Sequence, residues 1–105
     1  MYARVTLLEI DTLRATVDDA LAKFRDRTLS RLRAQAGYRG VWVLATSEGK
    51  AMLMSLWDTE AQADVEADHN FYGEELGHFA TLFRSPPGRD EYEVLLVDQP
   101  TEKLG

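Results

Sequence analysis

The chain has no cysteine, which excludes disulfides, thiolate metal sites and cysteine nucleophiles. It also has no apolar run close to the ~20 residues that a membrane-spanning helix needs. Its first residues lack the apolar core of a secretory signal, and no Gly-rich phosphate-binding loop occurs anywhere in it. We therefore expect a soluble, cytoplasmic protein that does not bind nucleotides through such a loop.

Positive charge is missing from a large part of the chain. Residues 51–83 contain no lysine or arginine, and their carboxylates are Asp58, Glu60, Asp64, Glu66, Asp68, Glu74 and Glu75. Residues 14–39 are basic instead, with Arg14, Lys23, Arg25, Arg27, Arg31, Arg33 and Arg39. Two interpretations are open: two solvated faces of opposite sign, or two segments that attract each other within or between subunits. The net charge of −6 argues against nucleic acid as the main partner.

The length and composition indicate one globular domain. A chain of 105 residues is long enough for one core. Its contents of 45% hydrophobic and 29% charged residues are ordinary for a folded protein. We expect a domain over residues 1–98, followed by a polar tail over 99–105.

Residues 38–57 are expected to form a β-hairpin around which the rest of the chain is organised. The first arm, Val41–Thr46, is rich in β-branched and aromatic residues, and Gly49 lies in a short polar connector. The second arm ends at Trp57. Both arms are apolar on both faces, whereas a strand that is wet on one side alternates apolar with polar residues. Both faces of this hairpin must therefore be covered.

The remaining elements follow from the spacing of apolar residues and from turn residues. Apolar residues at three- and four-residue steps predict helices, and a Thr-x-x-Asp pattern predicts the start of the first one. The predicted elements are a strand over Tyr2–Ile10, a helix over 17–36 that begins after Thr16, a helical region that begins at Asp58 or Thr59, a helix over 71–83, and a last strand over Glu91–Asp98.

The order of these elements is βαββαβ, which predicts an α+β, ferredoxin-like fold. In that fold both helices cover one face of a four-stranded antiparallel sheet. The other face would be bare and, in this chain, apolar over more area than a monomer tolerates. We therefore expect a homodimer that pairs through the sheet faces.

Three short stretches carry a resemblance to a known family. They are the junction Ala36-Gly37-Tyr38-Arg39-Gly40, the end of the hairpin Ser55-Leu56-Trp57-Asp58-Thr59-Glu60, and Pro86-Pro87 followed by Glu91-Tyr92-Glu93-Val94. The chain resembles the dimeric α+β barrel superfamily, most closely its antibiotic-biosynthesis-monooxygenase-like (ABM) branch. The resemblance implies a homodimeric barrel. It also implies one of several activities, because the family includes cofactor-independent oxygenases of phenolic and quinol substrates, haem-degrading enzymes, isomerases and members without known activity.

Histidine supplies the only side chains whose unperturbed pKa lies near neutrality, and the chain has two of them, His69 and His78. The spacing Glu75-x-x-His78 matches half of a di-iron site, but that chemistry needs a second copy, which is missing. The haem-degrading relatives use an Asn in the first strand and a Trp in the second helix, and neither is present here. His69 is expected at a break before the helix over 71–83, where it can turn toward a pocket together with Tyr72.

Other candidate residues have structural and functional interpretations. Trp57 is either a packing anchor or a wall of a pocket. Arg4 lies in the middle of a strand and needs a partner, for which Tyr92 or Glu93 of the last strand is expected. It could also stabilise an oxyanion.

We therefore predict a small homodimeric barrel that binds an apolar or aromatic molecule, with cofactor-independent oxygenation of a phenol or quinol as its chemistry. The alternative is a dimer that binds a ligand or has a structural role and catalyses no reaction. Haem degradation is a less favoured third possibility. The sequence leaves open whether the protein is an enzyme. No metal and no cofactor are expected. The predicted catalytic residues are His69, Tyr72 and Arg4, and the predicted substrate-binding residues are Trp57, Trp42, Phe79 and His78.

Overall fold

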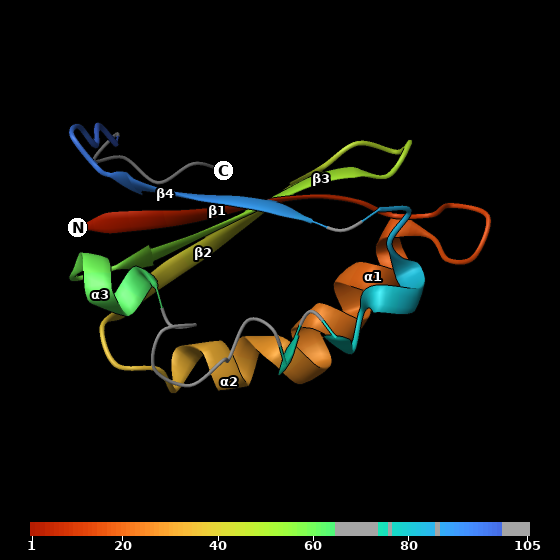
Figure 1. The fold of residues 1–105 in the computed structure, drawn as a ribbon, viewed down its shortest axis with the longest axis horizontal. Coiled ribbons are helices and arrows are strands. Elements are labelled where there is room, and N and C mark those ends of the chain that lie inside the picture. Colours follow the sequence, from red (N-terminus) through yellow and green to blue (C-terminus); the bar gives the residue numbers. More distant parts are fainter. Residues whose placement is uncertain (65–73, 76, 86, 100–105) are drawn as a thin grey trace.

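Four strands form one antiparallel sheet with the helices on one of its faces (Figure 1). The computed structural model describes residues 1–64, 74–75, 77–85 and 87–99. The strands are β1 (Tyr2–Glu9), β2 (Tyr38–Ala45), β3 (Lys50–Trp57) and β4 (Gly88–Glu93), in the spatial order β2-β3-β1-β4. The ferredoxin-like α+β fold predicted from the element order is confirmed.

The first helix consists of three joined segments, α1 (Val17–Lys23), the π-helical η1 (Phe24–Thr28) and α2 (Leu29–Arg33). It starts in the predicted capping box, in which the Asp19 N–H donates to Thr16 Oγ1 (3.0 Å) and the Thr16 N–H donates to Asp19 Oδ2 (3.3 Å). The Leu29 N–H donates to Phe24 O five residues back, which makes the middle segment a π-turn. Such turns occur frequently at functional sites.

The hairpin pairs β2 with β3 as expected. Ala45 lies opposite Ala51, and Gly49 adopts a φ of 101° in the connecting turn. Because side chains alternate between the faces of a strand, the registers assign Arg4, Thr6 and Leu8 of β1 to the helix-covered face and Ala3, Val5 and Leu7 to the outer face.

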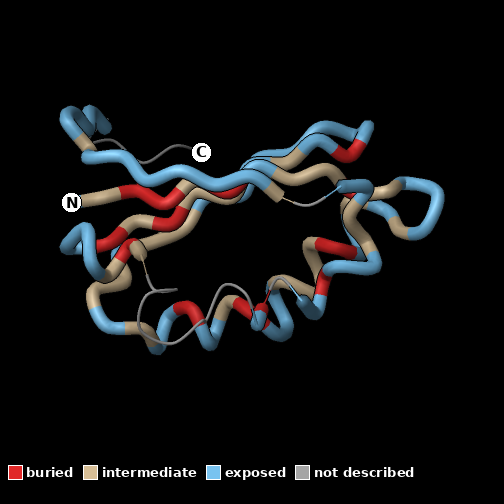
Figure 2. Tube along the Cα trace, in the orientation of Figure 1, coloured by how far each residue is buried: buried red, intermediate tan, exposed pale blue. Residues whose placement is uncertain are grey.

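The outer face of the sheet is apolar and no described residue covers it. Its exposed side chains include Leu7 (51% exposed), Trp42 (53%), Leu44 (48%), Met52 (37%) and Tyr92 (53%). Figure 2 shows the sheet as the upper layer, and all of β4 and much of β2 are exposed. We call Leu7, Trp42, Leu44, Met52 and Tyr92 the outer apolar face.

The last strand ends five residues earlier than the sequence predicts. β4 spans Gly88–Glu93, and residues 94–99 form no strand. The register explains the difference, because Glu93 lies opposite Tyr2, the first residue of β1. Among the described residues, a chain that continues past Glu93 has no neighbouring strand with which to form a ladder. The apolar run predicted as the strand's centre is therefore exposed, with Leu95 and Leu96 each 85% exposed.

A small core closes one end of the molecule, where α3 (Glu60–Ala63) packs against β1, β3 and β4. Thr59 caps this helix, in a capping box with Gln62. The core consists of Leu32, Trp57 and Ala63, with Tyr2, Phe24, Tyr38 and Val41 packed against it. The predicted helix over 71–83 falls partly outside the described residues; Ala80–Leu82 form the 3₁₀ segment η2. No helix among the described residues is long and apolar enough to span a membrane.

Candidate functional site

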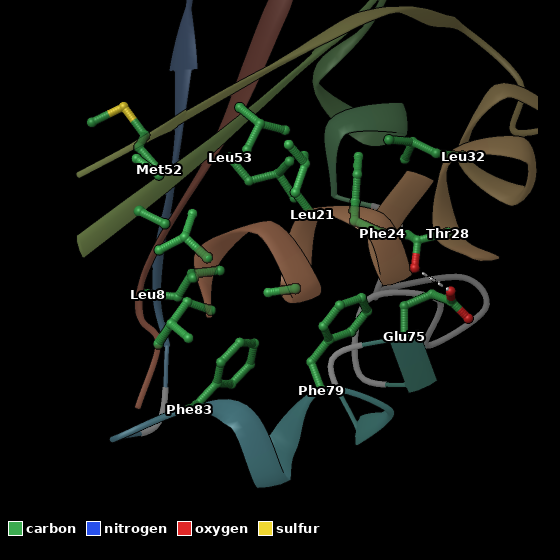
Figure 3. Close-up of a pocket in the computed structure, with 16 residues that line it drawn as sticks. Leu8, Leu21, Phe24, Thr28, Leu32, Met52, Leu53, Glu75, Phe79 and Phe83 are labelled. Atoms are coloured by element: carbon green, nitrogen blue, oxygen red, sulfur yellow. Dashed lines mark hydrogen bonds between the residues drawn. The ribbon is translucent and has the colours of Figure 1, made fainter. Parts of the chain in front are cut away.

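A cavity of about 300 Å³ lies between the sheet and the first helix (Figure 3). Most of its lining residues are apolar side chains from β1, β2, β3, the first helix and residues 79–83. The lining residues are Leu8, Ile10, Val17, Ala20, Leu21, Phe24, Thr28, Leu32, Val43, Ala45, Ala51, Met52, Leu53, Glu75, Phe79 and Phe83. Thr28 and Glu75 are the only polar residues among the lining residues that the structure describes.

The helical wall of the cavity is the stripe visible in the sequence. Val17, Ala20, Leu21, Phe24 and Thr28 recur at three- and four-residue steps, and all five line the cavity. The last two of them bound the π-turn η1. The apolar face of this helix therefore lines a space large enough for a ligand and also contributes to the core.

Glu75 is the one charged side chain among the described lining residues, and it is only 3% exposed. Its two carboxylate oxygens have different partners on the first helix. Thr28 Oγ1 donates to Oε1 at 3.0 Å, and Arg31 NH1 donates to Oε2 at 2.7 Å. Figure 3 shows Thr28 and Glu75 together on one side of the cavity, across from Leu8 and Phe83. The cavity therefore has one polar end.

Basic residues of the first helix hold the segment that contains Glu75. Lys23 Nζ donates to the backbone oxygen of His78 and lies 5.0 Å from the centre of the Phe79 ring. Arg27 NH2 contacts His78 Nε2. The ion pair Arg31–Glu75 joins the basic segment to the acidic one within a single chain, which favours the attraction over two separate solvated faces.

Replacing Arg31 with methionine tests this attraction. We expect the free energy of unfolding to fall by about 1–2 kcal/mol, because the buried Glu75 carboxylate keeps only Thr28 among its described donors. Raising salt from low to physiological strength should destabilise the native protein by up to ~1 kcal/mol and the variant by less, since salt screens partly exposed pairs. Chemical denaturation at both salt concentrations measures both effects, and Arg25→Met, at an exposed arginine of the same helix, is the control.

The predicted site residues are spread over several places. Phe79 lines the cavity, whereas His78 is exposed and lies outside the lining. Trp42 is 53% exposed on the outer apolar face. His69 and Tyr72 lie outside the described residues. The structure thus brings one of the predicted substrate-binding residues into the cavity wall.

Trp57 is completely buried but does not line the cavity. Its ring meets Tyr38 edge-on at a centroid distance of 5.8 Å, and its Nε1–H donates to Ser55 Oγ at 2.9 Å. It packs in the cluster with Leu32 and Ala63. These contacts favour the interpretation of Trp57 as a packing anchor over its interpretation as a wall of the pocket.

Arg4 is buried on the helix-covered face of the sheet, away from the cavity lining. Its NH1 donates to Ala63 O at 3.3 Å and lies 3.7 Å from Glu91 Oε1. Glu91 therefore takes the role expected of Tyr92 or Glu93, because the register places it directly opposite Arg4. Burial raises the pKa of Glu91, the Asp64 carboxylate adds to this rise, and Arg4 opposes it.

The sequence did contain a signal for Glu75. It precedes Phe79 by four residues, and Phe79 precedes Phe83 by four, so helical spacing assigns a carboxylate to an aromatic face. A charged residue within an apolar stripe lies either at the boundary of the core or buried as a functional group. In this chain Glu75 is buried.

No protein-family model and no curated protein matches the sequence, but solved structures do match the fold. A protein of unknown function from Nitrosomonas europaea is 22% identical, with a TM-score of 0.71 over 96% of this chain and 95% of its own. A monooxygenase from Streptomyces coelicolor, solved in complex with nanaomycin D, is 15% identical, with a TM-score of 0.71 over 95% of this chain and 92% of its own.

A third match is a MhuD variant solved with two manganese protoporphyrin IX molecules per active site. It is 17% identical, with a TM-score of 0.68 over 95% of this chain and all of its own. Another matching structure carries the name antibiotic biosynthesis monooxygenase. The chain therefore has the ABM-like fold, and some proteins with this fold bind small molecules.

Proposed function

We propose that this protein binds an apolar, aromatic small molecule in the cavity between the sheet and the first helix, and that it does so as a homodimer. The observation that carries the proposal is the cavity of about 300 Å³ with an almost wholly apolar lining. Protein interiors rarely keep voids much larger than a water molecule. A void of this size, with few polar groups in its wall, is typical of a small-molecule site.

The aromatic residues of the lining favour a ring-shaped ligand. Phe24, Phe79 and Phe83 contribute to the wall, and the Phe79 and Phe83 rings stack at a centroid distance of 6.3 Å with an angle of 11° between their planes. Phenyl rings pair favourably with other rings in offset-stacked and edge-on arrangements. A flat ligand can use both arrangements inside this cavity.

Cofactor-independent oxygenation of a phenolic or quinol ligand is the reaction that we propose for the site. A base removes a proton from the ligand, and the electron-rich ring carbon then reacts with O2. One oxygen atom enters the product as a carbonyl, and the other leaves as water with the two hydrogens that the ligand loses. A dry cavity suits such a step because it excludes competing water. The similarity in fold to a monooxygenase solved in complex with nanaomycin D supports this choice.

His69 and Tyr72 are our proposed acid–base residues, since histidine titrates near neutrality. Arg4, the oxyanion stabiliser expected from the sequence, is not among the residues that line the cavity and pairs with Glu91, so it is not part of the proposed site. Oxygen uptake measured with a panel of quinols distinguishes this reaction from the alternative, a dimer that binds its ligand without changing it. His69→Ala should abolish uptake at little cost in stability, and unchanged uptake in this variant would remove His69 from the proposal.

Filling the cavity tests the binding site directly. Ala20 is buried in α1 and lines the cavity, so in Ala20→Leu the added side chain would occupy space that the ligand needs. We expect this variant to fold and to bind 2-methylnaphthalene at least ~10-fold more weakly than the native protein, because ligand and side chain compete for one volume. Isothermal titration calorimetry measures the affinity.

The matched control for this test is Ala34→Leu, which makes the same change at an exposed position of the same helical region. It should leave the affinity unchanged. Equal binding to the native protein and to Ala20→Leu would place the ligand somewhere else and would contradict the proposal.

A further inference from the structure

Among the described residues, the side chains at the polar end of the cavity present hydrogen-bond acceptors only. An ionised carboxylate has acceptor sites for about four hydrogen bonds and no donor, and among the described residues Glu75 receives one from Thr28 and one from Arg31. The Thr28 hydroxyl must donate its hydrogen to Glu75, so its remaining lone pairs also accept. Acceptor capacity is therefore left at this end of the cavity.

Arg31 balances the charge of Glu75 from outside the cavity. It is bonded to Oε2, its side chain is 43% exposed, and it does not line the cavity. Since the pair is close to neutral, the ligand needs no positive charge to join it. A ligand carboxylate at the same place would face acceptor oxygens without a hydrogen to share, which disfavours anions.

We propose that Glu75 is the polar anchor of the cavity and that it accepts a hydrogen bond from an uncharged hydroxyl group on an otherwise apolar ring compound. This inference rests on the proposed binding of a small molecule in the cavity, and it defines both the chemistry and the orientation of that molecule. The hydroxyl lies beside Thr28 and Glu75, and the rings extend toward Leu8 and Phe83 (Figure 3).

A purely structural role is the competing explanation for Glu75. The carboxylate also links residues 74–75 to the first helix, and that link alone would make it important for stability. A structural link changes the melting temperature but does not distinguish between ligands of similar shape. The useful readout is therefore a ratio of affinities for two ligands of one size.

The experiment compares 2-naphthol, which is uncharged at neutral pH, with 2-methylnaphthalene, which has a methyl group where naphthol has its hydroxyl. Calorimetric titration gives the affinity ratio for the native protein, for Glu75→Leu and for Glu75→Gln. Glu74→Gln is the matched control, because Glu74 is exposed and its replacement makes the same change one residue away. Circular dichroism reports whether each variant folds.

We expect the native protein to prefer 2-naphthol by about tenfold or more, as a hydrogen bond to a charged group allows. Glu75→Leu should bring the ratio to one or below while 2-methylnaphthalene still binds, because a buried hydroxyl without an acceptor is unfavourable. Glu75→Gln keeps a neutral acceptor and should give an intermediate affinity ratio. This variant also allows the test if Glu75→Leu does not fold. Glu74→Gln should leave the ratio unchanged.

Several results would overturn the assignment of Glu75. They are equal affinity of the native protein for the two ligands, an unchanged ratio in the Glu75 variants, or tighter binding of 2-naphthoate than of 2-naphthol. In each of these cases the cavity remains a binding site. If neither naphthalene compound binds to the native protein, the proposed function fails together with this inference.

Discussion

Replacing Trp57 with alanine should lower the free energy of unfolding by about 4 kcal/mol, because truncating a buried aromatic side chain removes its burial and leaves a cavity. The indole is fully buried, meets Tyr38 edge-on and packs against Leu32 and Ala63. Its removal also takes the Nε1–H donor away from Ser55 Oγ. A loss of this size is a large part of the 5–15 kcal/mol that ordinarily stabilises a domain.

Chemical denaturation followed by far-ultraviolet circular dichroism measures the loss without depending on tryptophan fluorescence. Trp57→Phe keeps a ring in the core and loses the hydrogen bond to Ser55. Its free energy of unfolding should therefore lie between that of the native protein and that of Trp57→Ala. Leu13→Ala is the control, because Leu13 is 91% exposed. A cost below about 1 kcal/mol for Trp57→Ala would show that this end of the molecule is not held by the core cluster.

The fold could be predicted because its signals are local. Helix starts at Thr16 and Thr59 depend on capping boxes within four residues, and the hairpin turn depends on Gly49 with a positive φ. The order of elements then leaves few alternatives, and an apolar sheet requires a cover on each face. These features predict the four-stranded sheet with helices on one face.

Strand ends and ion-pair partners depend on register, which the sequence does not show. The run after Glu93 has the composition of a strand, yet it passes the end of β1 and has no strand beside it. The partner of Arg4 is Glu91 for the same reason. A shift of one residue exchanges the faces of a strand, so neither result could be obtained from composition alone.

The site was only partly predictable, because a cavity is the space left between elements that are distant in the sequence. The lining residue Phe79 was expected, and the three- and four-residue spacing of apolar residues predicted the first helix, whose apolar stripe lines the cavity. Glu75 was considered as part of the acidic segment and of a metal motif, and not as a lining residue. Its four-residue spacing from Phe79 assigns it to the aromatic face, but the pairing with Thr28 and Arg31 requires knowing where the first helix lies.

The outer apolar face supports the proposed homodimer, and it carries the second large effect. Leu7, Trp42, Leu44, Met52 and Tyr92 are all more than a third exposed and lie on the face away from the helices. Exposed apolar patches beyond a few hundred Å² are rare on monomers. A stable dimer buries about 800 Å² on each partner, and a sheet face is a surface of suitable shape for that contact.

Leu44→Lys should convert the proposed dimer into a monomer, because a lysine within a dry apolar interface would leave an unpaired charge there. We expect light scattering at micromolar concentration to give about twice the mass of one chain for the native protein. The variant should give the mass of one chain, with a dissociation constant raised by about 100-fold or more. Leu13→Lys introduces the same charge at a residue that is 91% exposed and lies outside the sheet, and it should remain dimeric. A native protein that scatters as a single chain, or a Leu44→Lys variant that stays dimeric, would contradict pairing through the outer apolar face.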